Sequence, residues 1–382
     1  MAQIVALLLL IDAAVAAARL LQFNSHGAFK ILQVADMHFA NGATTKCLDV
    51  LPEQYAGCSD LNTTSFVKRM IDAEKPDLIV FTGDNIYASD CSDPAESLDA
   101  AFAPAVEAKL PWAAVLGNHD QESSLKRSGV MDHIVQMNYT LAQVNPAGVA
   151  TIDGFGNYNL EVLAPGQDSE QESLLNLYFV DSGDYSTDPS IPGYGWVMPS
   201  QQAWLRNLSS SLQGSANQSR PALVFFHIPL PEVNNFTSSQ IVGVKQEMVA
   251  SPTFNSGFFQ TLVEMGDVKA AFTGHDHVND FCGELQHIQL CYGGGFGYHA
   301  YGKAGWSRRA RVIEASLSDG GGGVEKIMTW KRLDDEMLST TDKQELWRRR
   351  YEDHTILVES IATEGVEFPR YDPSFSSSNQ VW

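Results

Sequence analysis

The chain has 382 residues, of which 44% are hydrophobic, and its 25 basic and 46 acidic side chains give a formal net charge of −21. This composition supplies apolar surface for one large domain or two modest ones. A negative field repels nucleic acid and anionic lipid at long range, and no long Lys/Arg run offers a surface for a phosphate backbone. We therefore expect no nucleic-acid partner. A small phosphorylated substrate is still allowed, because bound dications dominate the potential inside their own site.

The first 18 residues resemble a cleaved signal peptide. An apolar run ends at Ile11 and is followed by the small residues Ala14-Val15-Ala16, in the order that signal peptides show. Asp12 interrupts this pattern and no basic residue precedes the run, so a membrane anchor or a wrongly assigned start is the alternative. No later segment approaches the roughly 20 apolar residues that a membrane helix needs. We expect no stable membrane insertion after signal cleavage.

Two further features favour the secretory pathway, with the extracellular space, the cell wall or the vacuole as destination. Sequons for N-glycosylation begin at Asn62, Asn138, Asn207, Asn217 and Asn235. The five cysteines permit two short-loop disulfides, Cys47–Cys58 and Cys282–Cys291, with Cys91 left over. Such disulfides suit an oxidising compartment. Five buried free thiols are the alternative, and the sequence leaves the oligomeric state open.

Apolar strands and amphipathic helices alternate along most of the chain. We predict strands at 30–35, 78–81, 112–116, 173–180, 222–226 and 268–273, and helices at 65–74, 97–109, 201–212 and 254–264. Strands that are apolar throughout are buried on both faces, which predicts an α/β layered fold. The segment 140–171 is rich in Gly, Pro and Asn, and we expect it to form long loops over the site.

The pattern changes after residue 277. Short strands are predicted at 282–292 and 310–316, with glycine-rich turns nearby. The charged segment 342–359 is predicted to be helical, and the Ser-rich tail 372–382 to be flexible. This divides the chain into a signal peptide at about 1–18, a main domain at 28–335, and a C-terminal extension of helix and tail at 336–382.

Five of the apolar runs end in side chains that can bind metal. They are Asp36-Met37-His38, Gly83-Asp84-Asn85, Gly117-Asn118-His119-Asp120, His227 and Gly274-His275-Asp276-His277. Open α/β sheets bind ligands beyond the carboxyl ends of their strands, so five clusters in such places indicate one site. Taken alone, each cluster also fits a polar turn, a surface loop or a buried histidine. Together they predict a metal centre.

The spacing of these residues and the types of their donor atoms indicate how many ions the centre can bind and which metals suit it. Residues i and i+2 of a strand share a face, so Asp36 and His38 can aim at one ion if the strand geometry runs through them. His275 and His277 have the same spacing and can serve one or two ions. The carboxylate of Asp84 has two oxygens and can bridge adjacent cations. Mixed imidazole, carboxylate and amide donors suit Zn, Fe or Mn better than Ca or Mg.

The series Asp-x-His, Gly-Asp, Gly-Asn-His-Asp, His and Gly-His-x-His resembles the calcineurin-like metallophosphoesterase superfamily over about residues 30–305. Segments 83–87, 177–185 and 291–301 are similar to a plant branch, usually called probable inactive purple acid phosphatases, which has fungal phosphatase relatives. The resemblance implies a four-layer α/β/β/α sandwich with two mixed β-sheets. It also makes residues 28–335 a metallophosphoesterase catalytic domain.

The same resemblance implies a role for each candidate ligand. Three side chains would hold a first ion: Asp36, His38 and His277. Three would hold a second: Asn118, His227 and His275. Asp84 would bridge the two ions.

One departure from the family pattern concerns iron and colour. True purple acid phosphatases have Asp-x-Gly at the first motif and use the Tyr of Gly-Asp-x-x-Tyr as an iron ligand. This chain has His38 in place of that Gly, and it also has Tyr87. We expect His38 to fill the ligand position and Tyr87 to pack beside it.

Two bound cations about 3.5–4 Å apart clamp a phosphoryl group and lower the pKa of a bridging water, which provides hydroxide for attack on phosphorus. His119 adjoins Asn118 but is not a ligand in the family. It is the candidate to protonate the leaving oxygen or to stabilise the transition state. Asp120 either orients His119 or serves the turn.

Aromatic and basic residues follow the last motif. Tyr298, His299 and Tyr301 either line the substrate pocket or pack beside a turn. For Arg308, Arg309 and Arg311, a strand with solvated charges is favoured over a set of phosphate contacts.

Three functions fit these observations. The favoured one is a phosphomonoesterase that acts like an acid phosphatase on a small phosphorylated substrate. The second is a phosphodiesterase on nucleotides or lipid head groups, with the same metal core. The third is a catalytically silent, metal-binding secreted glycoprotein. The presence of His119 and every expected ligand argues against the third, so we predict an active hydrolase.

Overall fold

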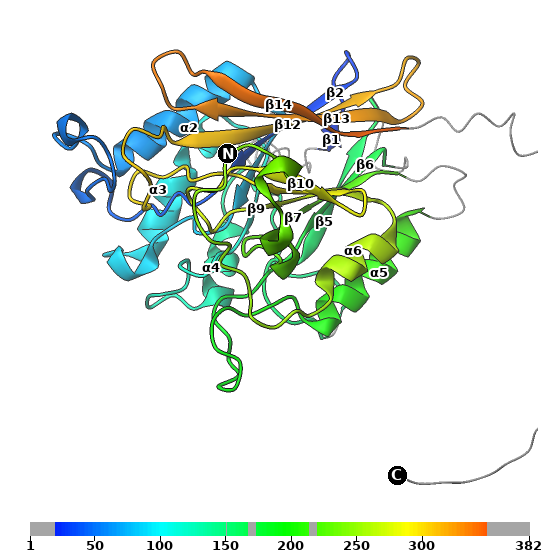
Figure 1. The fold of residues 1–382 in the computed structure, drawn as a ribbon, viewed down its shortest axis with the longest axis horizontal. Helices are drawn as coiled ribbons and strands as arrows, with labels where there is room; N and C mark the ends of the chain where they lie inside the picture. Colours follow the sequence, from blue (N-terminus) through cyan, green and yellow to red (C-terminus); the bar gives the residue numbers. More distant parts are fainter. Residues whose placement is uncertain (1–19, 150, 167–172, 214–219, 350–382) are drawn as a thin grey trace, which may run out of the picture. The chain divides into compact units, whose positions relative to one another are not determined.

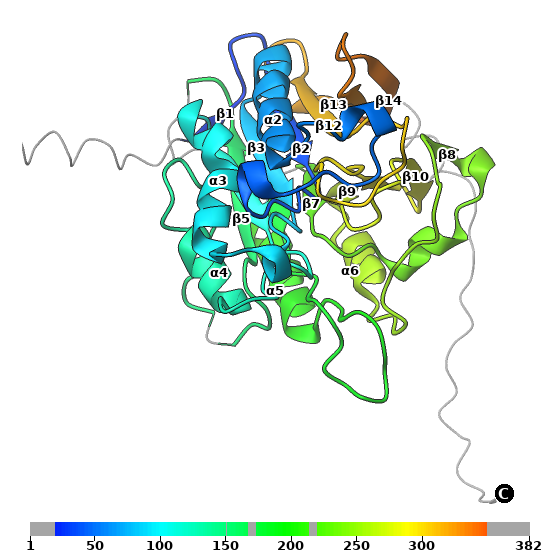
Figure 2. The ribbon, with the colours of Figure 1, turned by 90° about the vertical axis from the view of Figure 1, so that its left-hand side faces the viewer.

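Two β-sheets form the centre of the structure, a computed structural model that describes residues 20–149, 151–166, 173–213 and 220–349. The sheets pack face to face, and helices cover the outer face of each (Figures 1 and 2). Both sheets contain parallel and antiparallel pairs. The predicted four-layer α/β/β/α sandwich with two mixed sheets is confirmed.

The first sheet has eight strands in the order β1-β5-β6-β7-β9-β11-β10-β8. Its middle strands β6, β7, β9 and β11 are parallel, whereas β5, β10 and β8 make antiparallel pairs. The bounds are β1 Leu21–Gln22, β5 Tyr158–Leu163, β6 Leu175–Phe179, β7 Ala222–Phe225, β8 Ile241–Val242, β9 Val268–Thr273, β10 Cys282–Leu285 and β11 Ile288–Tyr292.

The second sheet has six strands in the order β14-β13-β12-β2-β3-β4. The pairs β2–β3 and β3–β4 are parallel, and the remaining pairs are antiparallel. The bounds are β2 Ala28–Val34, β3 Leu78–Thr82, β4 Trp112–Val115, β12 Arg309–Leu317, β13 Val324–Leu333 and β14 Thr340–Arg348.

Two groups of helices form the outer layers. Three of them cover the six-stranded sheet: α2 Asp60–Glu74, α3 Pro94–Glu107 and α4 Arg127–Ile134. Two pack on each other over the eight-stranded sheet: α5 Pro199–Gln213 and α6 Phe258–Met265. Capping side chains fix where α2 and α3 begin, since Ser59 accepts the amide of Leu61 and Asp93 accepts the amide of Ala95.

Alternation along β6 explains why this sheet is buried on both faces. Leu177 and Phe179 belong to the core between the two sheets. Tyr178 and Val180 belong to the second core, beneath α5 and α6. Successive side chains of a strand point to opposite faces, so a strand that is apolar throughout contributes to two cores at once. This is the physical basis of the continuous apolar runs in the sequence.

In each sheet, the register of the strands places the carboxyl ends of neighbouring parallel strands at the same level. Val34 of β2 pairs with Phe81 of β3, and Phe225 of β7 pairs with Phe272 of β9. A buried glutamine joins the two sheets at this level: the Gln33 amide donates to the Thr82 hydroxyl at 3.1 Å and to the Thr273 carbonyl at 3.0 Å. The loops that follow these strands therefore meet.

Two predictions of secondary structure are wrong. The described part of the segment predicted as a helix at 342–359 is strand β14, which pairs with β13 and carries the sheet past residue 335. An edge strand with one solvated face tolerates many charges. The charge content of this segment therefore did not distinguish a helix from a strand. The segment 140–171, predicted as long loops, contains strand β5, which pairs with β6.

Both predicted disulfides are present, Cys47–Cys58 and Cys282–Cys291, and Cys91 is a free thiol. The second disulfide joins paired positions of β10 and β11.

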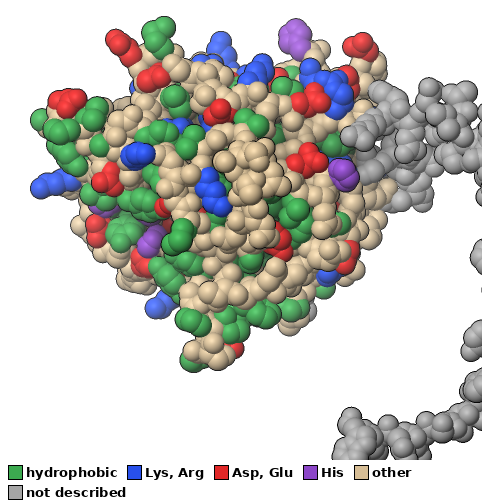
Figure 3. Space-filling model, viewed as in Figure 1, with side chains coloured by type: hydrophobic (Ala, Val, Ile, Leu, Met, Phe, Trp, Pro, Cys, Tyr) green, Lys and Arg blue, Asp and Glu red, His purple; other side chains and the backbone are tan. Residues whose placement is uncertain are grey.

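The predicted signal peptide 1–18, the sequon at Asn217 and the tail 372–382 lie outside the described residues. Among the described helices, none combines the length and the apolar character that a membrane crossing requires. On the face shown in Figure 3, Lys and Arg side chains are scattered; the absence of a nucleic-acid partner stays a prediction.

Candidate metal centre

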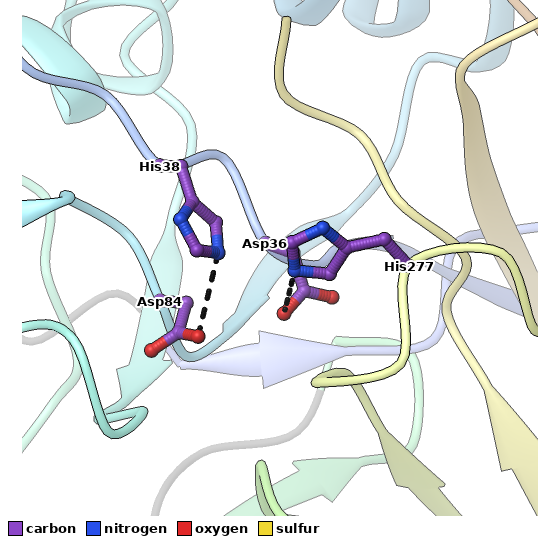
Figure 4. A group of neighbouring side chains, drawn as sticks. All are labelled: Asp36, His38, Asp84 and His277. Carbon is purple, nitrogen blue, oxygen red and sulfur yellow. Dashed lines mark ion pairs between the residues drawn. The ribbon is translucent and has the colours of Figure 1, made fainter. Parts of the chain in front are cut away.

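The structure brings the predicted ligands together in two groups that share one carboxylate. Donor atoms of the members of each group lie within 4.8 Å of one another. The first group, shown in Figure 4, contains Asp36, His38, Asp84 and His277, and the second contains Asp84, His227 and His275. The seventh candidate adjoins the second group, since Asn118 Oδ1 lies 3.2 Å from His227 Nε2. Every one of these side chains is buried.

Each candidate comes from a loop just beyond a strand. Asp36 and His38 follow β2, Asp84 follows β3, Asn118 follows β4, and the other three histidines follow β7 and β9. The spacing of Asp36 and His38 predicted that they share one face of a strand, but both residues lie beyond the end of β2. Their φ angles are 56° and 45°, in the left-handed region. They aim at one place because the chain turns at each residue, and such strained positions are typical of functional sites.

Two glycines of the motifs are needed for close approach. A Cβ at Gly117 would lie 2.1 Å from Asp84 Oδ1, and a Cβ at Gly83 would lie 2.5 Å from His227 Nδ1. Both distances are far below van der Waals contact. The motif Gly-Asp and the motif Gly-Asn-His-Asp therefore require glycine because each loop backbone lies against a candidate ligand from another strand.

Backbone carbonyls orient two of the imidazoles. Nδ1 of His227 lies 2.9 Å from the Thr82 carbonyl, and Nδ1 of His277 lies 3.0 Å from the Tyr301 carbonyl. A carbonyl can only accept, so each Nδ1 carries the hydrogen. Nε2 is then left as the donor atom toward the cluster, which is how metal-binding histidines are usually oriented.

Burial keeps three of the histidines in their neutral form. It lowers the pKa of His38, lowers that of His277 well below its ordinary value, and lowers that of His275 to about 3. Neutral imidazole is the form of histidine that binds metal. These three side chains are therefore ready to act as ligands at neutral pH.

Burial and mutual contacts shift the pKa values of Asp36, Asp84 and His227. Burial raises the pKa of Asp36 well above its ordinary value. Burial also opposes the charge of Asp84, but nearby His227 lowers the pKa of Asp84 well below the ordinary range. The same contact overcomes the effect of burial on His227 and raises its pKa to about 9. A bound cation would displace such protons.

Several donor atoms of the cluster have no hydrogen-bond partner among the described residues. They are Asp36 Oδ2, His38 Nε2 and His275 Nε2. Buried polar atoms are nearly always paired, and each of these three belongs to one of the two groups of candidate ligands. The unpaired atoms and the mixed oxygen and nitrogen donors fit a pair of transition-metal ions.

His119 lies beside the cluster, held by a glutamate that the sequence reasoning missed. Its amide donates to Asp84 Oδ1 at 2.8 Å, and its Nδ1 lies 2.7 Å from Glu122 Oε2. Tyr185 donates its hydroxyl hydrogen to the other oxygen of Glu122 at 3.3 Å. The spacing of three residues between His119 and Glu122 could have indicated this pairing.

Asp120 serves the turn and not His119, which decides between the two roles that we considered. Its carboxylate accepts the amides of Asn85, Ile86 and Gly117 at 2.7–3.0 Å. Arg127, which no motif marked, supports the same loop by donating to the Gly117 carbonyl at 2.7 Å and by pairing with Asp181.

A cavity of about 540 Å³ opens onto the donor atoms. His299 and Tyr301 line it, whereas the Tyr298 hydroxyl packs away against Asp334 at 2.6 Å. Tyr87 also lines it, with its ring stacked on His38 at a centroid distance of 5.4 Å, which is the packing position we expected.

The three arginines near the last motif are buried, so the prediction that their charges are solvated is wrong. Arg308, Arg309 and Arg311 are 6%, 4% and 0% exposed. Arg308 donates to the carbonyls of Leu48, Ala300 and Tyr301, and Arg309 pairs with Asp280. They support the loops behind the site.

Comparisons with known proteins show which family the chain is similar to. The family model described as calcineurin-like phosphoesterase matches residues 29–279. Probable inactive purple acid phosphatase 29 of Arabidopsis thaliana is 57% identical over 87% of this chain and 90% of its own length. Phosphatase DCR2 of Saccharomyces cerevisiae is 35% identical, over 83% of this chain and 55% of that protein.

Solved structures share the fold at low sequence identity. A dimetal phosphatase from Danio rerio matches with a TM-score of 0.55 and 13% identity, over 84% of this chain and 99% of that one. The purple acid phosphatase PPD1 of yellow lupin matches with a TM-score of 0.51 and 13% identity, over 83% of this chain and 53% of that one. The chain belongs to the calcineurin-like phosphoesterase family.

Proposed function

We propose that the protein is an active dinuclear metal-dependent phosphoric ester hydrolase whose main substrates are small phosphomonoesters. One observation carries the proposal: two buried groups of donor atoms share Asp84 and open, together with His119, onto one cavity. The names of several relatives contain the word inactive. This chain nevertheless has all seven candidate ligands and His119 in one place, which supports activity over a silent metal-binding role.

The ligand assignment follows the two groups. We assign three residues to a first ion (Asp36, His38 and His277), three to a second (Asn118, His227 and His275), and Asp84 to both. The donor set suits Zn, Fe or Mn. When bound, such ions supply positive charge to the phosphoryl group and lower the pKa of a coordinated water.

His119 supplies the proton in this scheme. Hydrolysis forms a bond between a water oxygen and phosphorus, breaks the bond between phosphorus and the ester oxygen, and needs a proton on the leaving oxygen. The carboxylate of Glu122 accepts from Nδ1 of His119, which leaves Nε2 as the nitrogen for the substrate. The ring lines the cavity beside Asp84, within reach of an ester held there.

The test measures metal content and turnover on the same purified protein. We expect about two metal ions per chain and hydrolysis of phosphomonoesters, with both lost in Asp84→Asn. The control is Asp132→Asn, an exposed carboxylate on α4, which should match the unchanged protein. Turnover of diesters alone would favour the phosphodiesterase. Full metal occupancy without any turnover would favour the silent binding protein.

We also propose that the protein passes through the secretory pathway, to the cell exterior, the cell wall or the vacuole. The two disulfides support an oxidising compartment. Among the sequon asparagines that the structure describes, three are exposed: Asn138, Asn207 and Asn235. Digestion of the secreted protein with an N-glycosidase should lower its mass, and an unchanged mass would contradict glycosylation.

A further inference from the structure

The cavity at the candidate metal centre has an inner and an outer wall. The inner wall consists of Asp84, Asp276, His119 and three of the candidate histidines. The other lining residues, which we call the outer wall, include Asp90, Tyr194, Glu247, Met248, His299 and Tyr301. A volume of about 540 Å³ is in the range of small-molecule sites and leaves room for the alcohol part of an ester beyond its phosphate.

The outer wall has two carboxylates, and its one histidine, His299, already pairs with one of them. Asp90 and Glu247 line it, and none of the described residues that line the cavity is Lys or Arg. Asp90 lies 3.1 Å from His299 Nε2, whereas no ion pair with Lys, Arg or His involves Glu247 within the described ranges. A second anionic group on the substrate would be repelled here, and a cationic group would be attracted.

Glu247 is held in a fixed position next to the metal centre. Its Oε1 accepts the amide of Val278 at 2.7 Å, and its Oε2 accepts the hydroxyl of Tyr301 at 2.9 Å. Val278 directly follows the candidate ligand His277. The carboxylate is therefore tied to the ligand loop itself, and its charge is placed at a set distance from the phosphate site.

Aromatic and sulfur-containing side chains line the same cavity as this carboxylate. The ring of Tyr301 stacks on His277 at 3.8 Å and stays 42% exposed, and the neighbouring Met248 is 88% exposed. Tyr194 meets His275 edge to face at 4.4 Å. Carboxylates and aromatic faces together bind alkylated ammonium groups, through charge and through cation–π attraction.

We propose that the preferred substrates are phosphate esters of alcohols that carry an ammonium group, which binds between the Glu247 carboxylate and the rings of Tyr301 and Tyr194. This rests on the proposed hydrolase function. The metal centre would hold the phosphate, and the outer wall would select the alcohol by its charge.

Two substrates of the same shape test the selection. Phosphocholine and 3,3-dimethylbutyl phosphate differ only in a quaternary nitrogen against a carbon. With the metal-loaded protein we expect kcat/KM about tenfold higher for phosphocholine, mainly through a lower KM. Glu247→Gln removes the charge but can keep both contacts, because its amide oxygen accepts the Val278 amide and its NH2 group donates to the Tyr301 hydroxyl oxygen. This variant should bring the ratio of the two kcat/KM values close to one. Glu264→Gln on α6 is the control and should leave that ratio unchanged.

Equal rates for the two esters, or a preference for the neutral ester, would overturn this inference while leaving the hydrolase in place. If neither ester nor p-nitrophenyl phosphate is hydrolysed, the proposed function fails instead. Calorimetry with the two corresponding phosphonates, which cannot be hydrolysed, then decides the inference by itself. Tighter binding of the ammonium phosphonate, lost in Glu247→Gln, supports it, and equal binding contradicts it.

Discussion

At the scale of single residues, the surroundings of His119 decide how it can act. Its Nδ1 lies 2.7 Å from Glu122 Oε2, and its ring contacts the ring of Tyr87 at a centroid distance of 4.8 Å. Tyr185 in turn holds Glu122. An imidazole held by a carboxylate through one nitrogen presents the other nitrogen in a fixed direction, which suits a general acid that donates a proton to a leaving group.

Removal of the imidazole should affect turnover more than metal binding. We expect His119→Ala to lower kcat by about 10²–10⁴-fold, the usual range for acid–base residues, with an unchanged metal content by elemental analysis. The loss should be large for an alkyl phosphate and small for p-nitrophenyl phosphate, because p-nitrophenolate leaves without a proton. Glu122→Gln should show the same dependence on the leaving group at smaller size, and Glu53→Gln, an exposed control, should show none. Unchanged turnover in His119→Ala would remove it from the mechanism.

At the scale of elements, a buried charge network joins three strands to the loop of the last motif. Asp280 Oδ2 accepts from Arg309 of β12 at 2.7 Å, and Asp280 Oδ1 lies 2.8 Å from Lys331 Nζ of β13. Lys331 also pairs with Asp342 of β14 at 2.5 Å. Burial opposes the charge of Asp280, but Lys331 and Arg309 lower its pKa. Strand β14 is thus linked to the metal-ligand loop through Lys331.

Loss of this carboxylate should destabilise the fold. Asp280→Asn leaves two buried cations with one carboxylate between them, so we expect the free energy of unfolding at pH 7 to fall by about 3–5 kcal/mol. Glu345→Gln breaks the exposed pair with Arg348 and should cost less than about 1 kcal/mol. Urea denaturation of the unchanged protein and the two variants measures both losses of unfolding free energy.

The contribution of Asp280 to stability should depend on pH. Because the folded protein lowers the pKa of Asp280, this contribution is present at pH values above the ordinary Asp range and is lost as the pH falls below that range. Equal stability of the two variants would contradict the network's role.

At the scale of the whole molecule, the candidate centre is assembled from loops of both sheets. Asp36, Asp84 and Asn118 come from the six-stranded sheet, and His227 and His275 from the eight-stranded one. An unfolded chain has no such site. Bound metal therefore stabilises only the folded state, by an amount set by its concentration relative to its Kd.

Metal removal should lower the melting temperature. At metal concentrations about a thousandfold above Kd the stabilisation is about 4 kcal/mol, which corresponds to roughly 5–10 °C for a domain of this size. Differential scanning calorimetry with chelator, and after return of Zn, Mn or Fe, measures the shift. Asp84→Asn should show a much smaller one. An equal melting temperature with and without metal would contradict a centre shared by the two sheets.

Much of the fold and of the candidate site could be predicted from local sequence. The apolar runs before Asp36, Asp84, Asn118, His227 and His275 mark buried strands, because burial on both faces leaves no polar positions. Parallel strands of one sheet end at one edge, so ligand-type side chains after each run are expected to meet. Their roles as ligands stay predictions. The exact aim of Asp36 and His38 was not predictable from strand alternation, because the turns that set it depend on contacts with other loops.

The sequence by itself predicted the layered fold, two short-loop disulfides and five clusters of candidate ligands, since apolar runs, cysteine spacing and the motifs after the runs are all patterns within short segments. Only the tertiary structure decided that Thr340–Arg348 is an edge strand, because a charged segment becomes a strand when a partner such as β13 offers its backbone. It also decided which side chains face the cavity. Glu247 belongs to no motif, and it reaches the centre because its carboxylate caps the amide of Val278, a contact between distant loops.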